Sequence, residues 1–384
     1  MSDFWVMHQA SLIFFLAVLL LIALSNLRSL RRLGTYPLPT HLPPLSVLVP
    51  ARDEETNIGP CVRSLLVQEY PDFEVLVLDD ASSDDTWRIA ETLAEEDDRL
   101  RVMAGRPLPS DWMGKHWACH QLAQAAGGSL LLFTDADTRH HPYALRDAVA
   151  ALQAEEADLL TALPCEEVLS WAEKLVVPII PWSLFAFLPL GLAHRSSRPA
   201  LSATIGQFML FRRQTYEQIG GHQAVRQETV DDIALGRLVK AQGLRWRMLD
   251  GTDRVRCRMY HNFREVYEGL SKNLFAAFGY NVLTFSFVWL WLGIVFGEPL
   301  VVLALRMIGV PVSELSLTLS IAAVTLSLLL WGLSHWRFCF PIYLALLYPI
   351  SLLLAEVIAG RSVLSTLTGR AQWKGRVLSK PQPR

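Results

Sequence analysis

The sequence has 384 residues, of which 52% are hydrophobic and 19% are charged, and its formal net charge is -2. This composition is too apolar for a purely soluble protein and too polar for a bundle of membrane helices alone, and the net charge gives no general footprint for binding nucleic acid. The five cysteines are scattered and include no CxxC pair, which argues against a disulfide framework or a zinc site and suits a reducing compartment.

An uncharged apolar stretch opens the chain. It runs from about Ala10 to Leu27, long enough to span a hydrocarbon core, and Arg28, Arg31 and Arg32 follow it directly. Basic residues at one end of a span favour the cytosolic side. A cleaved signal peptide carries its basic residues before the apolar run. We therefore expect residues 1–36 to form a retained membrane anchor with a cytosolic basic flank.

Residues 37–275 alternate between short apolar strands and polar-faced helices, after a proline-rich linker. The expected strands are Leu45–Val49, Glu74–Leu78, Ser129–Phe133 and Ala157–Leu163. The expected helices cover Asn57–Gln68, the segments after Thr86 and Pro142, Asp231–Gln242 and Asn262–Ala277. This alternation predicts an α/β domain with a mainly parallel sheet. Ligands of such sheets bind beyond the carboxyl ends of the strands.

Residues 171–194 interrupt this soluble pattern. The segment is rich in Trp, Phe and Leu, and its three prolines make it a poor spanning helix, so we expect an interfacial or re-entrant segment. Aromatic rings are favoured at headgroup depth, where we expect Trp171, Trp182 and Phe185. The segment would then form a lip at the membrane surface, beside the binding site of the α/β domain.

Residues 276–360 are expected to be a transmembrane region. Leu315–Leu333 and Phe338–Ile358 are clear spans. Asn281–Val310 contains the breaker Gly297-Glu298-Pro299 and could form one long kinked span or a hairpin; the charge of the tail favours the hairpin. The tail, residues 361–384, has basic residues and no acidic one. This bias predicts a cytosolic C-terminus and an even number of crossings after the α/β domain.

Acidic residues follow three of the expected strands. Asp135 and Asp137 come directly after one strand, and two carboxylates at this spacing can share Mn²⁺ or Mg²⁺ that keeps positions open for phosphate oxygens. A solvated turn is the structural alternative. The pair Asp79 and Asp80 closes another strand, and the stretch from Pro50 through Asp53 and Glu54 closes the first. Their joint placement at one sheet edge favours a functional site.

These three strand ends resemble those of family 2 glycosyltransferases with the Rossmann-like GT-A fold. By that resemblance Asp53 or Glu54 and Asp80 contact the base and ribose of a nucleotide sugar, Pro50, Asp79 and Asp135 belong to the same donor site, and Asp137 holds the metal on the diphosphate. Asp53 stands where the family more often has Asn. The resemblance implies a UDP- or GDP-sugar donor.

Further motifs extend the resemblance. Asp231 and Asp232 match an acidic pair that opens a helix, and Asp232 falls on the position of the base that an inverting transfer requires. In isolation the pair could be an ordinary acidic first turn. Lys115, in a Trp-x-Gly-Lys-x-Trp-Ala stretch, can offset charge on the leaving diphosphate. Gly206 and Gln207 resemble the floor of the acceptor pocket.

The chain is most similar to the membrane-attached subgroup that includes carotenoid- and hopanoid-associated glycosyltransferases and, more distantly, ceramide glucosyltransferase. This implies a lipid acceptor, a multi-pass cell-membrane location and a cytosolic catalytic domain. The Gln/Arg-x-x-Arg-Trp signature of processive polysaccharide synthases is absent, although Arg258 in that region could still reach a phosphate. A processive synthase and a non-catalytic membrane scaffold with a retired transferase domain remain the alternatives.

Overall fold

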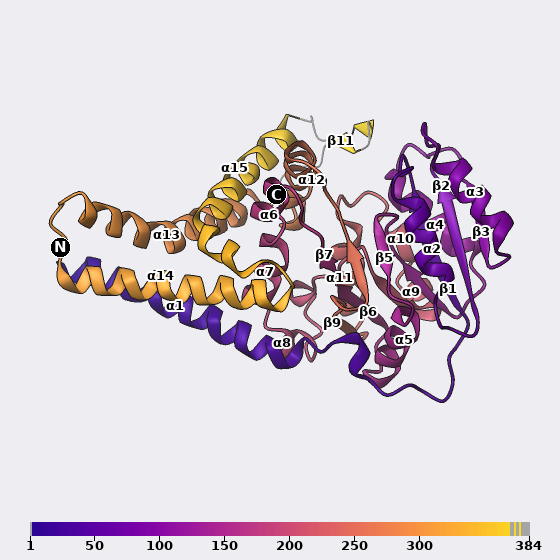
Figure 1. Ribbon diagram of the computed structural model, residues 1–384, viewed down its shortest axis with the longest axis horizontal. Helices are drawn as coiled ribbons and strands as arrows, with labels where there is room; N and C mark the ends of the chain where they lie inside the picture. Colours follow the sequence, from indigo (N-terminus) through magenta and orange to yellow (C-terminus); the bar gives the residue numbers. More distant parts are fainter. Residues whose placement is uncertain (1, 369–371, 374–375, 378–384) are drawn as a thin grey trace.

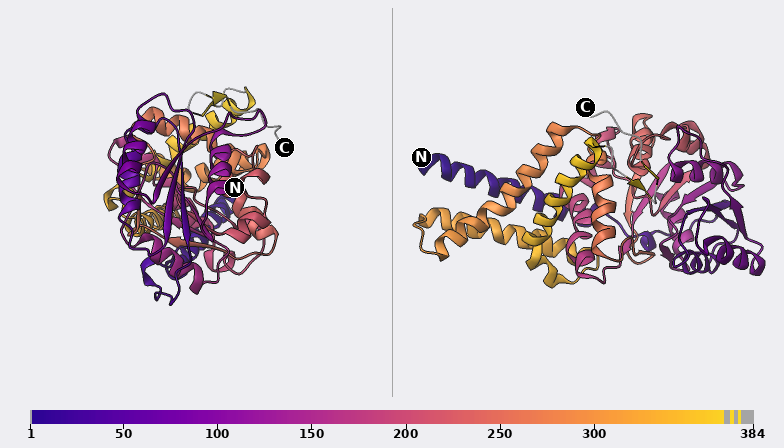
Figure 2. Two further views of the ribbon diagram at one scale, coloured as in Figure 1. Left: turned by 90° about the vertical axis from the view of Figure 1, so that its right-hand side faces the viewer. Right: turned by 90° about the horizontal axis from the view of Figure 1, so that it is seen from above.

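The computed structural model describes residues 2–368, 372–373 and 376–377. An α/β domain forms one end of the molecule, and a narrower bundle of long helices extends from it (Figures 1 and 2). The N-terminus lies at the far tip of the bundle (Figure 1). Of the predicted basic tail, residues 361–384, the structure describes 361–368 at the end of α15 (Tyr348–Leu367) and the short strands β11 (Gln372–Trp373) and β12 (Arg376–Val377); the rest lies outside the described residues.

Among the described residues, seven strands form the main sheet, in the order β3-β2-β1-β4-β8-β6-β9. These are β1 (Leu45–Ala51), β2 (Phe73–Asp79), β3 (Leu100–Ala104), β4 (Leu130–Phe133), β6 (Leu159–Leu163), β8 (Met209–Arg212) and β9 (Trp246–Asp250). All run parallel except β8, which is antiparallel to both neighbours. The predicted mainly parallel sheet is therefore confirmed. Because β8 runs backwards, the residues just before it lie at the carboxyl edge of the other strands.

Helices cover both faces of this sheet. They are α2 (Ile58–Leu66), α3 (Thr86–Glu96), α4 (Gly114–Ala125), α5 (Ala144–Ala154), α9 (Arg213–Gln218), α10 (Gly221–Ala224) and α11 (Asp231–Ala241). Side chains alternate between the faces: Val47 and Val49 pack in the core with α2, α3 and α5, whereas Leu48 packs with α4. The core formed by Leu48 and α4 is continuous with the helix bundle, because it also contains Leu16 and Trp331.

A smaller sheet lies beside the carboxyl edge. It has the order β5-β10-β7 and consists of β5 (Thr138–His140), β7 (Cys165–Glu166) and β10 (Val255–Cys257). Short 3₁₀ turns occur at η1 (Leu33–Thr35), η2 (Pro199–Leu201) and η3 (Ile342–Leu347). The small sheet matters for function because β5 follows Asp137 directly and places that residue between the two sheets.

Four described helices are long and apolar enough to cross a membrane, one near the N-terminus and three near the C-terminus. They are α1 (Ser2–Ser29), α13 (Val282–Met307), α14 (Glu314–Arg337) and α15 (Tyr348–Leu367, preceded by η3). The amphipathic helix α12 (Phe263–Ala277) leads into them, as predicted. This confirms an α/β domain with one N-terminal and several C-terminal apolar helices.

The hairpin predicted within Asn281–Val310 is wrong, because α13 runs without interruption through Pro299. Glu298, which suggested a turn, instead lies 2.6 Å from Nε2 of His8 in α1. Neighbouring helices can compensate for the backbone hydrogen bond that a proline removes. The Gly297-Glu298-Pro299 stretch therefore marks a polar contact between α1 and α13 instead of a chain reversal.

The helix α15 does not extend along the full bundle. Its first residue, Tyr348, packs against Trp331 and Phe296, which lie between the ends of α14 and α13. Near its other end, Ser362 Oγ accepts a 3.0 Å hydrogen bond from the Phe275 amide of α12. In Figure 1, α15 accordingly lies nearer to the α/β domain than the tip of α13 and α14 does. The chain therefore turns back within the bundle.

The proline-containing segment forms three short helices instead of one span: α6 (Trp171–Val176), α7 (Ile179–Phe187) and α8 (Leu190–Ala193). Trp171 is 61% exposed, but Trp182 and Phe185 are each only 1% exposed. Trp182 stacks on Trp331 of α14 with ring centroids 4.5 Å apart. The predicted headgroup position is therefore wrong for Trp182 and Phe185, because the bundle helices cover them.

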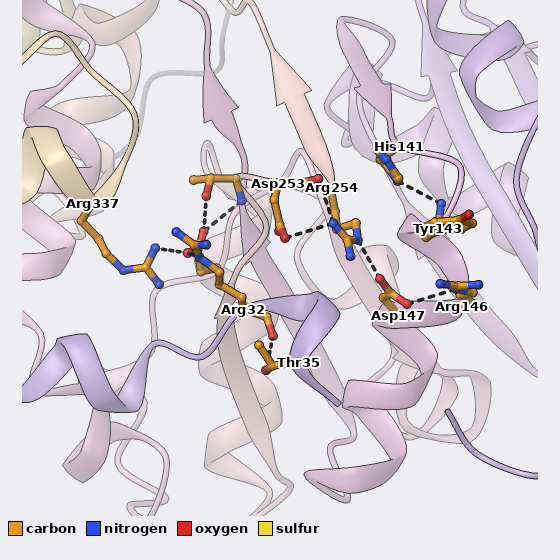
Figure 3. Close-up of polar contacts among 11 residues, drawn as sticks. Arg32, Thr35, His141, Tyr143, Arg146, Asp147, Asp253, Arg254 and Arg337 are labelled. Atoms are coloured by element: carbon orange, nitrogen blue, oxygen red, sulfur yellow. Dashed lines mark hydrogen bonds and ion pairs between the residues drawn. The ribbon is translucent and has the colours of Figure 1, made fainter. Parts of the chain in front are cut away.

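An arginine–aspartate–arginine cluster joins the bundle to the α/β domain. Asp250, at the end of β9, is fully buried and pairs with Arg337 at the end of α14 and with Arg32 after α1. Figure 3 shows the two arginines approaching from different segments. Arg337 also donates to the carbonyl of Leu30 at 2.9 Å. The ends of α1 and α14 that lie nearest the α/β domain are thus held by one carboxylate.

Candidate active site

The predicted site residues gather at the carboxyl edge of the main sheet. β1, β2 and β4 are parallel neighbours, so the residues that follow them lie side by side. Gly206 and Gln207 reach the same edge because they precede the reversed strand β8. Segments separated by up to about 180 residues in the chain therefore lie along one sheet edge, with the first turn of α11 beside them.

The first two strand ends support each other's loops. Asp53 has a left-handed φ of 50°, and its Oδ1 accepts a 2.7 Å hydrogen bond from the Ser83 amide. The Glu54 amide donates to Thr86 Oγ1 at 2.7 Å. Arg52 donates to the carbonyl oxygen of Asp80 at 2.6 Å. These contacts order the loops in which Pro50, Asp53, Glu54 and Asp80 were predicted to bind a nucleotide.

Asp79 is buried beside this loop pair. Its Oδ2 accepts a hydrogen bond from the Ser82 amide at 3.2 Å, and its Oδ1 has no hydrogen-bond partner. A buried acceptor without a partner is rare in folded proteins. Asp79 therefore orders the loop with one oxygen, and its other oxygen is a buried acceptor at the predicted donor site.

The carboxylates after β4 have different environments. Asp135 Oδ1 lies 2.6 Å from Lys115 Nζ at the start of α4. Burial lowers the pKa of Lys115, but the carboxylates of Asp135 and Asp231 outweigh it and raise the pKa well above its usual value. Asp137 Oδ1 is buried and has no hydrogen-bond partner. Burial and the neighbouring charge of Asp135 raise the pKa of Asp137 to about 7.

The acidic pair of α11 is also divided. Asp231 is 6% exposed and faces His116 and His222. Asp232 is half-buried, and its Oδ2 accepts a 2.9 Å hydrogen bond from the Gly206 amide. Burial and the charge of Asp231 raise the pKa of Asp232 to about 7. The more accessible Asp232 is thus the better placed of the two to exchange a proton with a ligand.

Gly206 is the point where these groups meet. A Cβ atom added to Gly206 would lie 3.1 Å from Asp232 Oδ2 and 3.5 Å from Lys115 Nζ. A side chain would therefore fill the space between the carboxylate and the ammonium group. The neighbouring Gln207 donates to Glu166 Oε1 at 3.3 Å. The predicted small-residue floor lies next to the predicted base.

A cavity of about 430 Å³ opens beside Asp137. It is lined by Thr56, Asn57, Asp137, Arg139, Glu167, Leu169, Arg256, Cys257, Arg258 and His261. Arg258 also pairs with Glu173 at 3.3 Å, so this arginine is partly neutralised. Three guanidinium groups near one wall suit an anionic ligand such as a phosphate.

Several site residues were not predicted from the sequence. Glu166 is half-buried, and its pKa lies well above the usual range because of desolvation and the charges of Asp137 and Asp135. Arg139 and Arg256 line the cavity from β5 and β10. The sequence has little signal for these residues, since the small sheet that gathers them is built from strands of two or three residues.

The donor set fits a hard divalent cation that is completed by substrate. No group of three or more His, Cys, Asp or Glu side chains suited to a metal occurs among the described residues. Mg²⁺ usually takes one or two protein carboxylates together with phosphate oxygens and water. The partnerless oxygen of Asp137 and the nearby carboxylate of Asp135 match that requirement.

Comparisons with known proteins concern the family and the fold. Residues 46–220 match the family described as Glycosyl transferase family 2. Two relatives are 4,4'-diaponeurosporenoate glycosyltransferases of Staphylococcus aureus. The enzyme of strain USA300 is 26% identical over 261 residues, which cover 64% of this chain and 66% of the relative. The enzyme of strain MRSA252 is 27% identical over 241 residues, which cover 60% of this chain and 60% of the relative. The match thus spans slightly less than two-thirds of the relatives' length.

A solved structure shows a similar fold. It is the mannosyltransferase PcManGT from Pyrobaculum calidifontis in complex with GDP-Man and Mn²⁺, with 16% sequence identity, a TM-score of 0.56 and coverage of 94% of this chain and 97% of that chain. The GT-A fold inferred from the motifs is confirmed. The matched family model covers residues 46–220, just under half of the chain.

Proposed function

We propose that this chain, which carries a glycosyltransferase family 2 domain, transfers a sugar from a nucleotide sugar to a lipid acceptor at the membrane surface. The observation that carries the proposal is the meeting of Asp232 and Lys115 at Gly206, next to the Asp135–Asp137 pair. A proton acceptor and a cation beside a phosphate-binding edge are what sugar transfer from a diphosphate requires.

The donor's diphosphate is proposed to bind between Asp137 and the arginine-lined cavity. A Mn²⁺ or Mg²⁺ ion held by Asp137, with Asp135 beside it, would neutralise phosphate charge there. Lys115 and Arg258 would add positive charge as the leaving diphosphate forms. The nucleoside is proposed to lie over the loops after β1 and β2, near Pro50, Asp53, Glu54 and Asp80. The motif resemblance implies a UDP- or GDP-sugar.

The transfer step is proposed to invert the anomeric carbon. The acceptor oxygen forms a bond to that carbon, the bond from the carbon to the diphosphate oxygen breaks, and Asp232 Oδ takes the acceptor's proton. The nucleoside diphosphate leaves with the bonding electrons. Gly206 fixes Asp232 through its amide and leaves room for the acceptor.

A lipid acceptor is supported by the apolar elements around the cleft. The cavity beside Asp137 includes Leu169, which precedes α6, and both Leu169 and Trp171 are more than half exposed. Exposed apolar residues next to long apolar helices are typical of a membrane interface. The Staphylococcus relatives are named for 4,4'-diaponeurosporenoate, and we propose a long-chain lipid acceptor that carries a hydroxyl group, whose proton Asp232 takes. The basic flank after α1 supports a cytosolic catalytic domain in the cell membrane.

The test uses the full chain in lipid nanodiscs. It is incubated with a panel of UDP- and GDP-sugars and a lipid extract, with Mn²⁺ or with excess chelator, and products are identified by mass spectrometry. We expect one glycolipid that requires the metal. Asp137→Asn should abolish transfer and remove metal-dependent donor binding, and Asp232→Asn should lower kcat by about 10²- to 10⁴-fold with donor binding retained. Full activity of Asp232→Asn, or transfer in excess chelator, would contradict the mechanism.

A further inference from the structure

A buried polar cluster lies against Asp231. His222 and Tyr216 are 0% and 6% exposed, and His116 is 2% exposed. His222 Nε2 lies 3.4 Å from Asp231 Oδ2, and His116 Nε2 lies 3.7 Å from Asp231 Oδ1. The carboxylate is thus flanked by imidazole rings from α4 and α10, at the first residue of α11. None of these histidines belongs to the proposed transfer step.

Tyr216 fixes how His222 presents itself to Asp231. Its hydroxyl oxygen accepts a hydrogen bond from the His222 amide at 3.1 Å and lies 2.9 Å from His222 Nδ1. Because the oxygen accepts the amide hydrogen, its own proton is available for Nδ1. That arrangement leaves the ring proton on Nε2, which faces Asp231.

The backbone before His222 is shaped for this contact. Gly220 and Gly221 both have left-handed φ angles, of 80° and 50°. A Cβ atom on Gly221 would come within 2.4 Å of the Tyr216 ring, so only glycine allows Tyr216 and His222 to meet.

Asp231 in turn controls the first turn of α11. Val230, which precedes the helix, has no polar side chain that could cap it. Asp232 follows Asp231 directly, and its carboxylate accepts hydrogen bonds from the amides of Gly206 and Ile233. A rotation of this turn would move Asp232 away from Gly206.

We propose that His222 is a positioning residue that acts through Asp231 to hold Asp232 in its productive orientation. The inference rests on the proposed function, in which Asp232 takes the proton of the acceptor. His222 touches neither the donor nor the acceptor. Its loss should therefore slow the transfer step without weakening the binding of either substrate.

The test compares two substitutions at one position. In His222→Gln the side-chain amide can still point toward Asp231, as Nε2 does at 3.4 Å, whereas in His222→Asn the shorter amide reaches only toward Tyr216. We expect His222→Asn to lower kcat about 10- to 100-fold, the scale of a small misplacement of a catalytic group, with KM and donor Kd within about twofold. His222→Gln should recover most of the loss. Melting temperatures are measured for both.

A double substitution separates this role from a merely structural one. If His222 acts through Asp231, then His222→Asn should cause no further loss of kcat in an Asp231→Asn background. Tyr216→Phe removes the hydroxyl that orients His222 and should lower kcat several-fold, which also covers the case that His222→Asn does not fold. The matched control Tyr36→Phe removes a 2.8 Å hydrogen bond to Glu155 outside the site and should leave kcat unchanged.

The outcomes distinguish this inference from the proposed function. Equal losses in His222→Gln and His222→Asn, a loss confined to KM, or additive losses in the double variant would overturn the positioning role. An unaltered enzyme that transfers no sugar from any donor would overturn the proposed function instead, whatever the melting temperatures of the variants.

Discussion

At the scale of single residues, the proposed chemistry depends on two adjacent aspartates in opposite environments. Burial raises the pKa of Asp231, but the neighbouring His116 and Lys115 outweigh it and hold the pKa well below the usual range. Asp232 has a pKa raised to about 7 by burial and by the charge of Asp231. Neighbouring groups whose pKa values are separated by their surroundings commonly have different roles. Asp231 remains a charge, and Asp232 can gain and lose a proton near neutral pH.

This difference predicts the pH dependence of transfer. A base must be ionised to accept a proton, so kcat should rise with pH through a midpoint near the Asp232 pKa of about 7 and level off at higher pH. Removing the neighbouring charge in Asp231→Asn should shift the midpoint to lower pH. The measurement is kcat at saturating substrate from about pH 5.5 to 8.5, with melting temperature recorded at each pH. A flat profile, or a midpoint that Asp231→Asn moves upward, would contradict the assignment.

The sequence predicted which residues would meet, but not how each would be engaged. Asp135, Asp137, Asp232 and Gly206 all lie at the predicted sheet edge, because parallel strands end together. That Asp135 pairs with Lys115 follows from the position of α4 over the sheet, which no local pattern encodes. The contact of His222 with Asp231 could not be predicted from the sequence either, because it depends on how three helices pack.

At the scale of secondary-structure elements, the segment that forms α6 to α8 shows that hydrophobicity alone does not distinguish a lipid-facing segment from a buried one. Its prolines indicated correctly that it does not form one long helix. Its aromatic residues, however, suit a lipid interface and a protein core equally well. Phe185 packs edge-on against Phe338 with ring centroids 5.6 Å apart, so helix contacts replace the lipid contacts that were expected. Only Trp171 remains exposed as predicted.

The burial of Phe185 and the exposure of Trp171 predict different results when each is replaced by aspartate. Phe185→Asp would bury an unpaired charge, at a cost of several kcal/mol, and should reduce the folded yield and lower the melting temperature, with donor binding lost as well. Trp171→Asp places the same charge on an exposed position. It should retain the melting temperature and donor binding but reduce transfer to long-chain acceptors. Size-exclusion profiles, thermal unfolding and donor titration test both. A well-folded Phe185→Asp protein would contradict the buried position.

At the scale of the whole molecule, the arginine–aspartate–arginine cluster couples the bundle to the α/β domain (Figure 3). Removing one partner of a buried ion pair leaves an uncompensated charge and costs about 3–5 kcal/mol. Arg337→Gln should therefore lower the melting temperature markedly. The double variant Arg337→Gln with Asp250→Asn should be less destabilised than the sum of the two single variants. The surface pair Arg264–Glu268 is the control, and Arg264→Gln should change the melting temperature little.

The course of the helices through the bundle predicts the membrane topology. The α14 residue Ser316 meets Trp5 at the tip, while Arg337 meets Asp250 at the α/β domain. The helices α1, α13 and α14 therefore run the full length, whereas α15 begins inside the bundle and returns to the domain. Although α15 is apolar enough to span, its contacts make it re-entrant. We predict three crossings, with residue 368 on the same side as the catalytic domain.

Native and introduced thiols test this arrangement. Cys339 follows α14 and is exposed, whereas Cys61, Cys119 and Cys257 are buried. A membrane-impermeant thiol reagent should label Cys339 only when it reaches the catalytic face, and a cysteine introduced as Thr368→Cys in a Cys339→Ser background should behave in the same way. Val310→Cys in that background, between α13 and α14, should be labelled from the opposite face. If Thr368→Cys instead follows Val310→Cys, then α15 crosses the bilayer, and the packing of Tyr348 against Trp331 of α14 does not describe the protein in a membrane.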